Sequence, residues 1–188
     1  MKSLPLLPNL IIIGGSSRNV GKTTLALKLI EKYCANEKII GLKVTSIKPG
    51  EETFHGSHES FNLQHYSIIE ETVIDGRKDT SRMLLAGAEK VFYIETPDHL
   101  LGEAMSEFLL KVGADSPIIC ESRSLRKVVK PGLFVLLKHY DQMLIKPEFK
   151  QFEKLADSTH TIVKNSRSTG SLSDKIVWDG KSWSLNNY

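Results

Sequence analysis

Apolar runs and amphipathic segments alternate along most of the chain. Short apolar runs without an apolar–polar alternation, typical of buried parallel strands, lie at 9–13, 38–44, 91–94, 117–120, 133–137 and 159–163. Segments whose apolar residues recur at helical spacing lie at 22–34, 81–86, 98–112 and 148–156. This order predicts an α/β fold with three layers, a mostly parallel sheet covered by helices on both faces.

Two segments depart from that alternation. Residues 45–78 are polar and rich in glycine and histidine, and a connection of this length is usually functional or mobile. In 174–188, apolar residues flank Asp179 and Gly180, which predicts a C-terminal β-hairpin on a two-residue turn, adding an antiparallel edge to the sheet. We expect the serine-rich stretch 166–173 to be a flexible link. The whole chain, 1–188, is predicted to be a single domain.

Composition and charge narrow the function classes. The chain is 40% hydrophobic and 25% charged, as in soluble globular proteins, and its net charge of +3 is too small to indicate a nucleic acid or an anionic membrane as partner. No apolar run approaches the roughly 20 residues that span a bilayer. We therefore expect a cytoplasmic protein in which Cys34 and Cys120 are reduced thiols.

A glycine-rich loop between the first predicted strand and helix carries the strongest chemical signal. In Gly-Lys-Thr at 21–23, the glycine allows close approach of the backbone to a phosphate, the lysine is a point charge for the β and γ phosphates, and the Thr23 hydroxyl can bind Mg²⁺. The amino end of the next helix adds positive potential. The residues predicted to bind nucleotide are Gly15, Ser16, Ser17, Arg18, Asn19, Val20, Gly21, Lys22, Thr23 and Thr24.

Charged residues at or near predicted strand ends complete the candidate site. Glu121 follows the strand 117–120 directly, so we expect it to hold Mg²⁺ with Thr23 or to orient an attacking water, although a salt bridge with a nearby arginine is the alternative. Lys22 and Glu121 are the predicted catalytic residues. Lys43, Asp79 and Arg82 are candidates for contact with a substrate or phosphate, and Asp79 or Thr80 is equally expected to be a helix N-cap.

Other polar clusters have weaker support. His55, His58 and His65 match no metal-ligand spacing and are expected to be solvated loop residues. The basic residues Arg123, Arg126, Lys127 and Lys130 form either a rim for an anionic ligand or a solvated turn. The chain has no Asn-Lys-x-Asp segment, so the choice between ATP and GTP stays open.

Two motifs resemble known families. The first glycine of the usual phosphate loop is replaced by Ser16, and the spacing from Gly15 to Thr23 is similar to that of dethiobiotin synthetase and its relatives. The run from Gly76 to Ala88 resembles the Gly-Lys-Asp-Ser, Arg, Ala-Gly-Ala run of the molybdopterin-guanine dinucleotide biosynthesis protein B family. With Gly41-Leu-Lys, the resemblance covers about residues 10–125.

The resemblance implies a P-loop NTPase that binds GTP with Mg²⁺, hydrolyses it slowly and assists a partner protein in molybdenum-cofactor assembly. Two alternatives stay open: an ATP-dependent ligase or kinase of the dethiobiotin-synthetase type, in which Lys43 and 45–78 close over a small acidic substrate, and a nucleotide-sensing module with almost no turnover. A homodimer through the edge of the hairpin Trp178–Trp183 is a further option.

Overall fold

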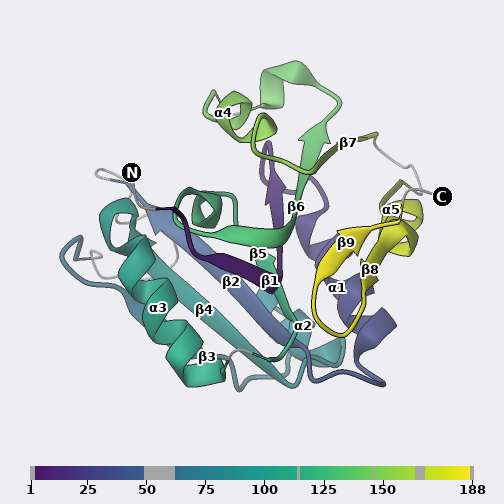
Figure 1. Cartoon of the computed structure of the whole chain (residues 1–188). Coiled ribbons are helices and arrows are strands. Elements are labelled where there is room, and N and C mark those ends of the chain that lie inside the picture. Colours follow the sequence, from purple (N-terminus) through teal and green to yellow (C-terminus); the bar gives the residue numbers. More distant parts are fainter. Residues whose placement is uncertain (1–2, 49–61, 114, 146, 164–167, 187–188) are drawn as a thin grey trace.

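A computed structural model of the chain describes residues 3–48, 62–113, 115–145, 147–163 and 168–186. Its main sheet has seven strands in the order β3-β4-β2-β5-β1-β6-β7 (Figure 1). All neighbouring strands in it are parallel except β3 and β4. The strands are β1 (Leu6–Gly15), β2 (Ile40–Ile47), β3 (Ser67–Glu70), β4 (Lys90–Pro97), β5 (Ile118–Glu121), β6 (Lys130–His139) and β7 (Ser158–Ile162).

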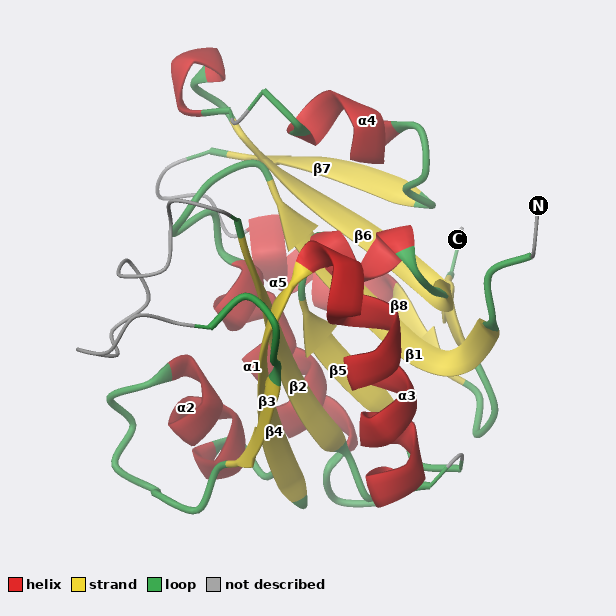
Figure 2. Cartoon of the chain, turned by 90° about the vertical axis from the view of Figure 1, so that its left-hand side faces the viewer, coloured by secondary structure: helices red, strands yellow, loops and turns green. Residues whose placement is uncertain are grey.

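Helices cover both faces of this sheet. Helix α3 lies on one face, and α1 and α2 lie on the other (Figure 2). The helices are α1 (Lys22–Tyr33), α2 (Asp79–Leu85), α3 (Leu101–Val112), α4 (Phe149–Glu153) and α5 (Ser168–Lys175), with short 3₁₀ turns at Asp98–Leu100, Ser124–Lys127 and Gln142–Leu144. The predicted three-layer α/β fold is confirmed. Helix α2 has Lys78 in the N-cap position, so neither Asp79 nor Thr80 is the N-cap.

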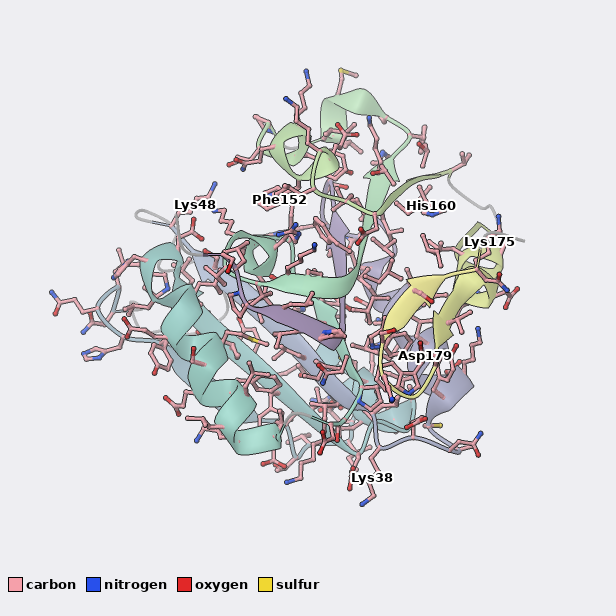
Figure 3. The ribbon with its side chains drawn as sticks, viewed as in Figure 1. Lys38, Lys48, Phe152, His160, Lys175 and Asp179 are labelled. Atoms are coloured by element: carbon pink, nitrogen blue, oxygen red, sulfur yellow. The ribbon has the colours of Figure 1, made fainter. Side chains whose placement is uncertain are left out.

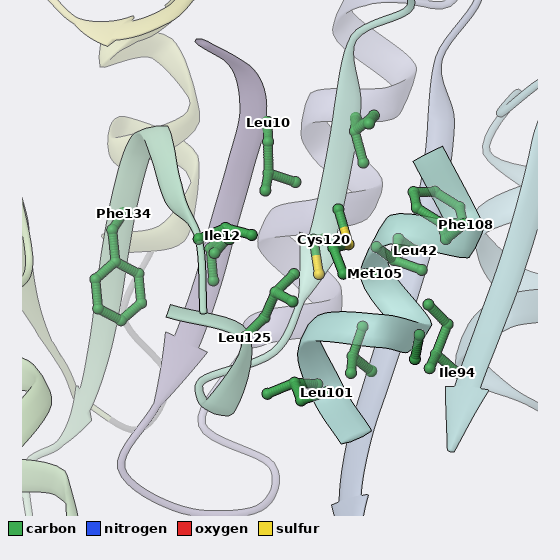
Figure 4. Close-up of a cluster of buried hydrophobic side chains, with 14 of the residues drawn as sticks. Leu10, Ile12, Leu42, Ile94, Leu101, Met105, Phe108, Cys120, Leu125 and Phe134 are labelled. Atoms are coloured by element: carbon green, nitrogen blue, oxygen red, sulfur yellow. The ribbon is translucent and has the colours of Figure 1, made fainter. Parts of the chain in front are cut away.

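The two faces of the sheet build two separate cores. Leu10 and Ile12 of β1 point to the α3 side, where they join Leu42, Ile94 and Phe108 (Figure 4). Ile11 and Ile13 point to the other side and pack with buried leucines of α1. Because each fully buried aliphatic side chain stabilises a fold by about 1.5–3 kcal/mol, both layers fix the position of β1. The end of β1 is thus a rigid start for the glycine-rich loop.

The polar segment 45–78 contains more regular structure than expected. Strand β2 continues to Ile47, and Ser67–Glu70 forms β3, which pairs antiparallel with β4. The antiparallel edge of the sheet is therefore here and not at the C-terminal hairpin. Residues 49–61, which include His55 and His58, lie outside the described part of the chain.

The C-terminal hairpin forms a small sheet of its own. Strands β8 (Ile176–Trp178) and β9 (Trp183–Leu185) pair only with each other in the described structure, so the expected addition to the main sheet is wrong. Trp178 pairs with Trp183, which leaves a four-residue connection rather than a two-residue turn. The stretch 166–173 was expected to be a flexible link, but its described part, 168–173, belongs to helix α5.

The hairpin packs against α1 and β1 (Figure 1). The ring of Trp183 meets that of Tyr33 edge-on at 5.4 Å, and its indole N–H donates to the carbonyl of Asn9 at 2.9 Å. The Tyr33 hydroxyl accepts from the N–H of Trp178 and donates to the carbonyl of Ile176. Both tryptophans are thus buried within their own chain, where they support the far end of α1.

Candidate functional site

The loop between β1 and α1 is shaped by residues with a left-handed backbone. Asn19 has φ 58° and Gly21 has φ 98°, a region that glycine enters freely. A side chain at Gly15 would place its Cβ 2.6 Å from Cγ1 of Val20, which is 1% exposed and packs in the core. The loop therefore closes tightly over its own valine, and the free N–H groups at the start of α1 lie at its end.

Ser16, which replaces the usual first glycine, points away from the loop interior. It is fully buried, its N–H donates to the carbonyl of Leu137, and its hydroxyl accepts from the N–H of His139 at 2.8 Å. Since the side chain is used by β6, a serine is accommodated where other phosphate loops have glycine.

Lys22 lies beside a pocket of ≈ 160 Å³ that Gly15, Ser17, Arg18 and Arg123 also line. Its Nζ donates to the carbonyl of Ser17 at 3.0 Å, and among the described residues it forms no ion pair within 4.0 Å. Burial lowers the pKa of Lys22, and the negative charge of Glu121 opposes this shift. A half-buried ammonium with a carbonyl partner favours an anionic ligand.

Thr23 and two carboxylates form an acidic corner next to the pocket. Thr23 acts on both carboxyl groups, because its side chain lowers the pKa of Asp79 and that of Glu121. Glu121 is 4% exposed, and its Oε1 has no hydrogen-bond partner in the described structure. Burial raises the pKa of Glu121, although the hydrogen bond from Thr23 and the charge of Lys43 favour the ionised form. This carboxylate oxygen is placed to accept a cation or a proton.

Lys43 crosses from the sheet to α2. It is the direct neighbour of Glu121 in the register of β2 and β5, and its ammonium donates to Asp79. Burial opposes ionisation of Asp79, but the hydrogen bond and charge of Lys43, together with Thr23 and Arg82, lower its pKa. The Nη1 of Arg82 is 3.6 Å from Oδ1 of Asp79. The structure therefore brings together predicted residues from four separate segments, namely the start of α1, β2, α2 and the end of β5.

The start of α2 is anchored to the segment before it. The hydroxyl of Ser81 accepts from the N–H groups of Asp75 and Gly76, each at 2.8 Å. Thr80 donates to Oε2 of Glu71 at 2.7 Å. These bonds fix the first turn of α2 and so keep Asp79 in its place in the acidic corner.

Arg123 is the site residue that the sequence motifs missed. It lines the same pocket as Lys22, and its Nη1 donates to the carbonyl of Gly15 at 3.5 Å. Its guanidinium lies over the ring of Phe152, 5.2 Å from the centroid, and burial lowers its pKa. Its place in a basic run was the signal, but that signal did not separate it from its neighbours.

The rest of that basic run does not reach the pocket. Arg126 donates to the carbonyl of Val129, Lys127 pairs with Asp98 at 2.6 Å, and Lys130 is exposed at the start of β6. Of the four basic residues, only Arg123 lines the pocket.

Several other predicted residues lie apart from this cluster. Thr24 is exposed on α1, and His65 is exposed before β3. Cys34 and Cys120 are free thiols. Among the described residues, no group of three or more histidine, cysteine, aspartate or glutamate side chains could hold a metal, so any cation at Glu121 would also need oxygen atoms from Thr23 or a ligand.

Comparison with known proteins gives one likeness at the level of structure. No protein-family model and no curated protein sequence matches the chain. A crystal structure of an "apo" form of LpxK from Aquifex aeolicus in complex with ATP superimposes with a TM-score of 0.54 at 12% identity. It covers 88% of this chain and 52% of LpxK.

The chain has a P-loop fold. The strand, glycine-rich loop and helix sit in the parallel sheet with the loop strand β1 between β5 and β6. The chain spans about half the length of LpxK, so the likeness concerns the shared fold. In the parts of the chain that the structure covers, no helix has the length and apolar character needed to cross a membrane.

Proposed function

We propose that the protein binds a purine nucleoside triphosphate with Mg²⁺ at residues 15–24 and hydrolyses it slowly. One observation carries this proposal: Lys22 and Arg123 face the same small pocket, and their hydrogen bonds there go to uncharged carbonyls. Charge-assisted hydrogen bonds to phosphate are stronger than bonds to a neutral carbonyl. A phosphate would therefore supply the negative charge that this pocket lacks.

The acidic corner fits a Mg²⁺ ion. Mg²⁺ prefers a few protein oxygens together with phosphate oxygens and water, and the Thr23 hydroxyl and the unpartnered Oε1 of Glu121 provide such oxygens. When bound, the ion would neutralise charge that develops on the phosphates. Asp79 would orient the Thr23 hydroxyl, while Lys43 and Arg82 keep Asp79 ionised.

The remaining groups of the loop would position the phosphates. The N–H groups at the start of α1 and the ammonium of Lys22 would hold the phosphate chain, as in other phosphate loops. Glu121 would bind the ion or orient a water molecule for attack on the terminal phosphate. With few groups placed for proton transfer, slow hydrolysis is the expected intrinsic activity.

The biological role that we favour is that of an adaptor NTPase in cofactor biosynthesis, resembling molybdopterin-guanine dinucleotide biosynthesis protein B. The segment from Gly76 to Ala88 supports it, because its Asp79 is influenced by Thr23 of the loop and is paired with Arg82. A partner protein would then raise the turnover. The likeness to LpxK crystallised with ATP supports ATP as ligand, whereas the family resemblance supports GTP.

Nucleotide binding is tested by titrating fluorescent ATP and GTP analogues with and without Mg²⁺. We expect binding that depends on Mg²⁺ and that Lys22→Ala abolishes. Lys38→Ala is the control, because Lys38 is highly exposed and its pair with Glu89 is of the weak surface type. Full affinity of Lys22→Ala for either nucleotide would refute the proposal.

A second candidate is an ATP-dependent kinase or ligase that acts on a small acidic substrate. The likeness to LpxK, which was crystallised with ATP, favours an ATP-dependent enzyme. Against it, Lys43, the expected partner of the acidic substrate, is already paired with Asp79. Strong ATP preference with turnover stimulated by a small molecule would favour this enzyme. Turnover that needs a second protein would favour the adaptor, and binding without turnover in either case would favour a nucleotide sensor.

A further inference from the structure

Arg123 enters the pocket from the segment that follows β5. It comes two residues after Glu121, so the guanidinium that lines the pocket and the candidate metal-binding carboxylate belong to the same strand end. Its hydrogen bond to the carbonyl of Gly15 is long, 3.5 Å, at the upper limit for such a bond. The guanidinium has five N–H donors, so this one weak bond leaves donors for a ligand.

Side chains from α4 hold Arg123 from behind. Phe152 is 2% exposed, and its ring supports the guanidinium face at 5.2 Å. Glu148, the N-cap residue of α4, pairs with Lys48, and Figure 3 places Lys48 and Phe152 toward the same end of the molecule. The hydrogen bond from Lys48 lowers the pKa of Glu148 to about 2, with a further contribution from the charge of Arg123.

We propose that Arg123 is a catalytic residue that binds the terminal phosphate of the nucleotide. The arginine is thus supplied by the same chain that binds the nucleotide. This inference rests on the nucleotide binding proposed above. The Phe152 ring supports the guanidinium from one side. Its N–H donors can then meet two phosphate oxygens at once, which is the geometry in which arginine binds phosphate best. Two cations then line the pocket, Lys22 from the loop and Arg123 from the segment after β5.

The assignment predicts a selective effect on the third phosphate. An arginine that contacts only the terminal phosphate contributes to triphosphate binding and, more strongly, to the transition state of its transfer, where charge spreads over the terminal oxygens. It contributes nothing to binding of the diphosphate. A purely structural arginine would change the affinity for both nucleotides or for neither.

The experiment compares Arg123→Ala with the wild-type chain in three measurements: affinity for the nucleoside triphosphate, affinity for the diphosphate, and single-turnover hydrolysis, all with Mg²⁺. We expect about 10-fold weaker triphosphate binding from the lost charge-assisted bonds, with diphosphate affinity changed less than about 2-fold. Hydrolysis should fall by about 10³-fold, the lower end for a transition-state arginine. Arg123→Lys should recover part of the triphosphate affinity but little of the rate, because lysine lacks the planar fork.

Arg126→Ala is the matched control, since Arg126 belongs to the 3₁₀ turn that directly follows Arg123 and donates to the carbonyl of Val129. It should leave all three measurements unchanged. Equal weakening of both nucleotides, or an unchanged hydrolysis rate in Arg123→Ala, overturns the inference while nucleotide binding stands. Wild-type protein that binds no nucleotide overturns both. If Arg123→Ala does not fold, Arg123→Lys decides by the same comparison of triphosphate with diphosphate.

Discussion

The hydroxyl of Ser16 accepts a hydrogen bond from the backbone N–H of His139, 2.8 Å away, and so joins the glycine-rich loop to the end of β6. The N–H of Ser16 donates to Leu137 on the same strand. In a loop with glycine at this position, only the second of these bonds can form. The loop of this protein thus has an attachment that the usual motif lacks.

Ser16→Ala should destabilise the protein by about 1–3 kcal/mol, because it leaves the part-buried N–H of His139 without its acceptor. Denaturant unfolding measures the loss. The matched control is Ser17→Ala, since the Ser17 hydroxyl is buried with no hydrogen-bond partner in the described structure. Its removal should be neutral or stabilising. Equal losses in the two variants would contradict the role given to the bond with His139.

Glu121→Gln should stabilise the protein without ligand, and the gain should increase with pH. Burial raises the pKa of Glu121 in the folded state, so its stabilising contribution is complete below the unfolded pKa and is lost as pH rises through the folded pKa. Glutamine is neutral throughout. Thermal unfolding of both proteins from pH 4 to pH 8 in the absence of Mg²⁺ would show the difference.

In the same scan, Glu89→Gln should follow the wild-type curve, because Glu89 lies on the surface and pairs with an exposed lysine. With Mg²⁺ and nucleotide present, the wild-type protein should be more stable than Glu121→Gln, the reverse of the order without ligand. Glu121→Gln removes a charge that the ion needs. A gain in stability from Glu121→Gln that does not vary with pH would contradict burial as the cause of the raised pKa of Glu121.

Lys43 and Asp79 should be energetically coupled. Lys43→Met and Asp79→Asn each remove half of an ion pair whose side chains are about one-third exposed. In a double-mutant cycle we expect a coupling of about 1 kcal/mol, within the range for contacting charged residues. Urea unfolding at low and high salt provides the measurement, and the coupling should fall with salt. Additive single changes would show that the pair does not hold α2 to β2.

Trp183→Ala should cost about 3–5 kcal/mol, the usual cost for a buried aromatic residue. Trp183 is 1% exposed and is bonded to the carbonyl of Asn9. Trp183→Phe keeps most of the packing but leaves that carbonyl without its donor, so its loss should be smaller. Because the hairpin lies at the far end of α1, the nucleotide affinity of the Phe variant should stay unchanged. A drop in affinity at equal stability would contradict this separation.

The central strands and the phosphate loop were predictable because each has a strong local signal. The parallel strands read as unbroken apolar runs, and Lys22 follows the glycine that begins a helix. Strand β3 was missed because it lies at the edge of the sheet, where Ile69 and Glu70 are exposed and give no buried pattern. Its pairing with β4 is decided by tertiary contacts.

Helix α5 was missed for a related reason. Its serine-rich sequence has little helical preference, but the ammonium of Lys32 donates to the carbonyls of Ser173 and Ile176 at its carboxyl end. That support comes from a residue 141 positions earlier, which no local pattern shows. Arg123 was missed for the same reason. Its contact with Phe152 distinguishes it from the other basic residues, and Phe152 belongs to an element distant in the sequence.

The contact of Tyr33 with Ile176 joins residues that are 143 positions apart in the chain. During synthesis, α1 has its whole length available long before its outer end has anything to pack against. Contacts of such separation form slowly, because a long loop must close before they contribute. The helix that begins with Lys22 should therefore be secured late in folding, and the growing chain should remain sensitive to proteases at α1 until the hairpin has emerged from the ribosome.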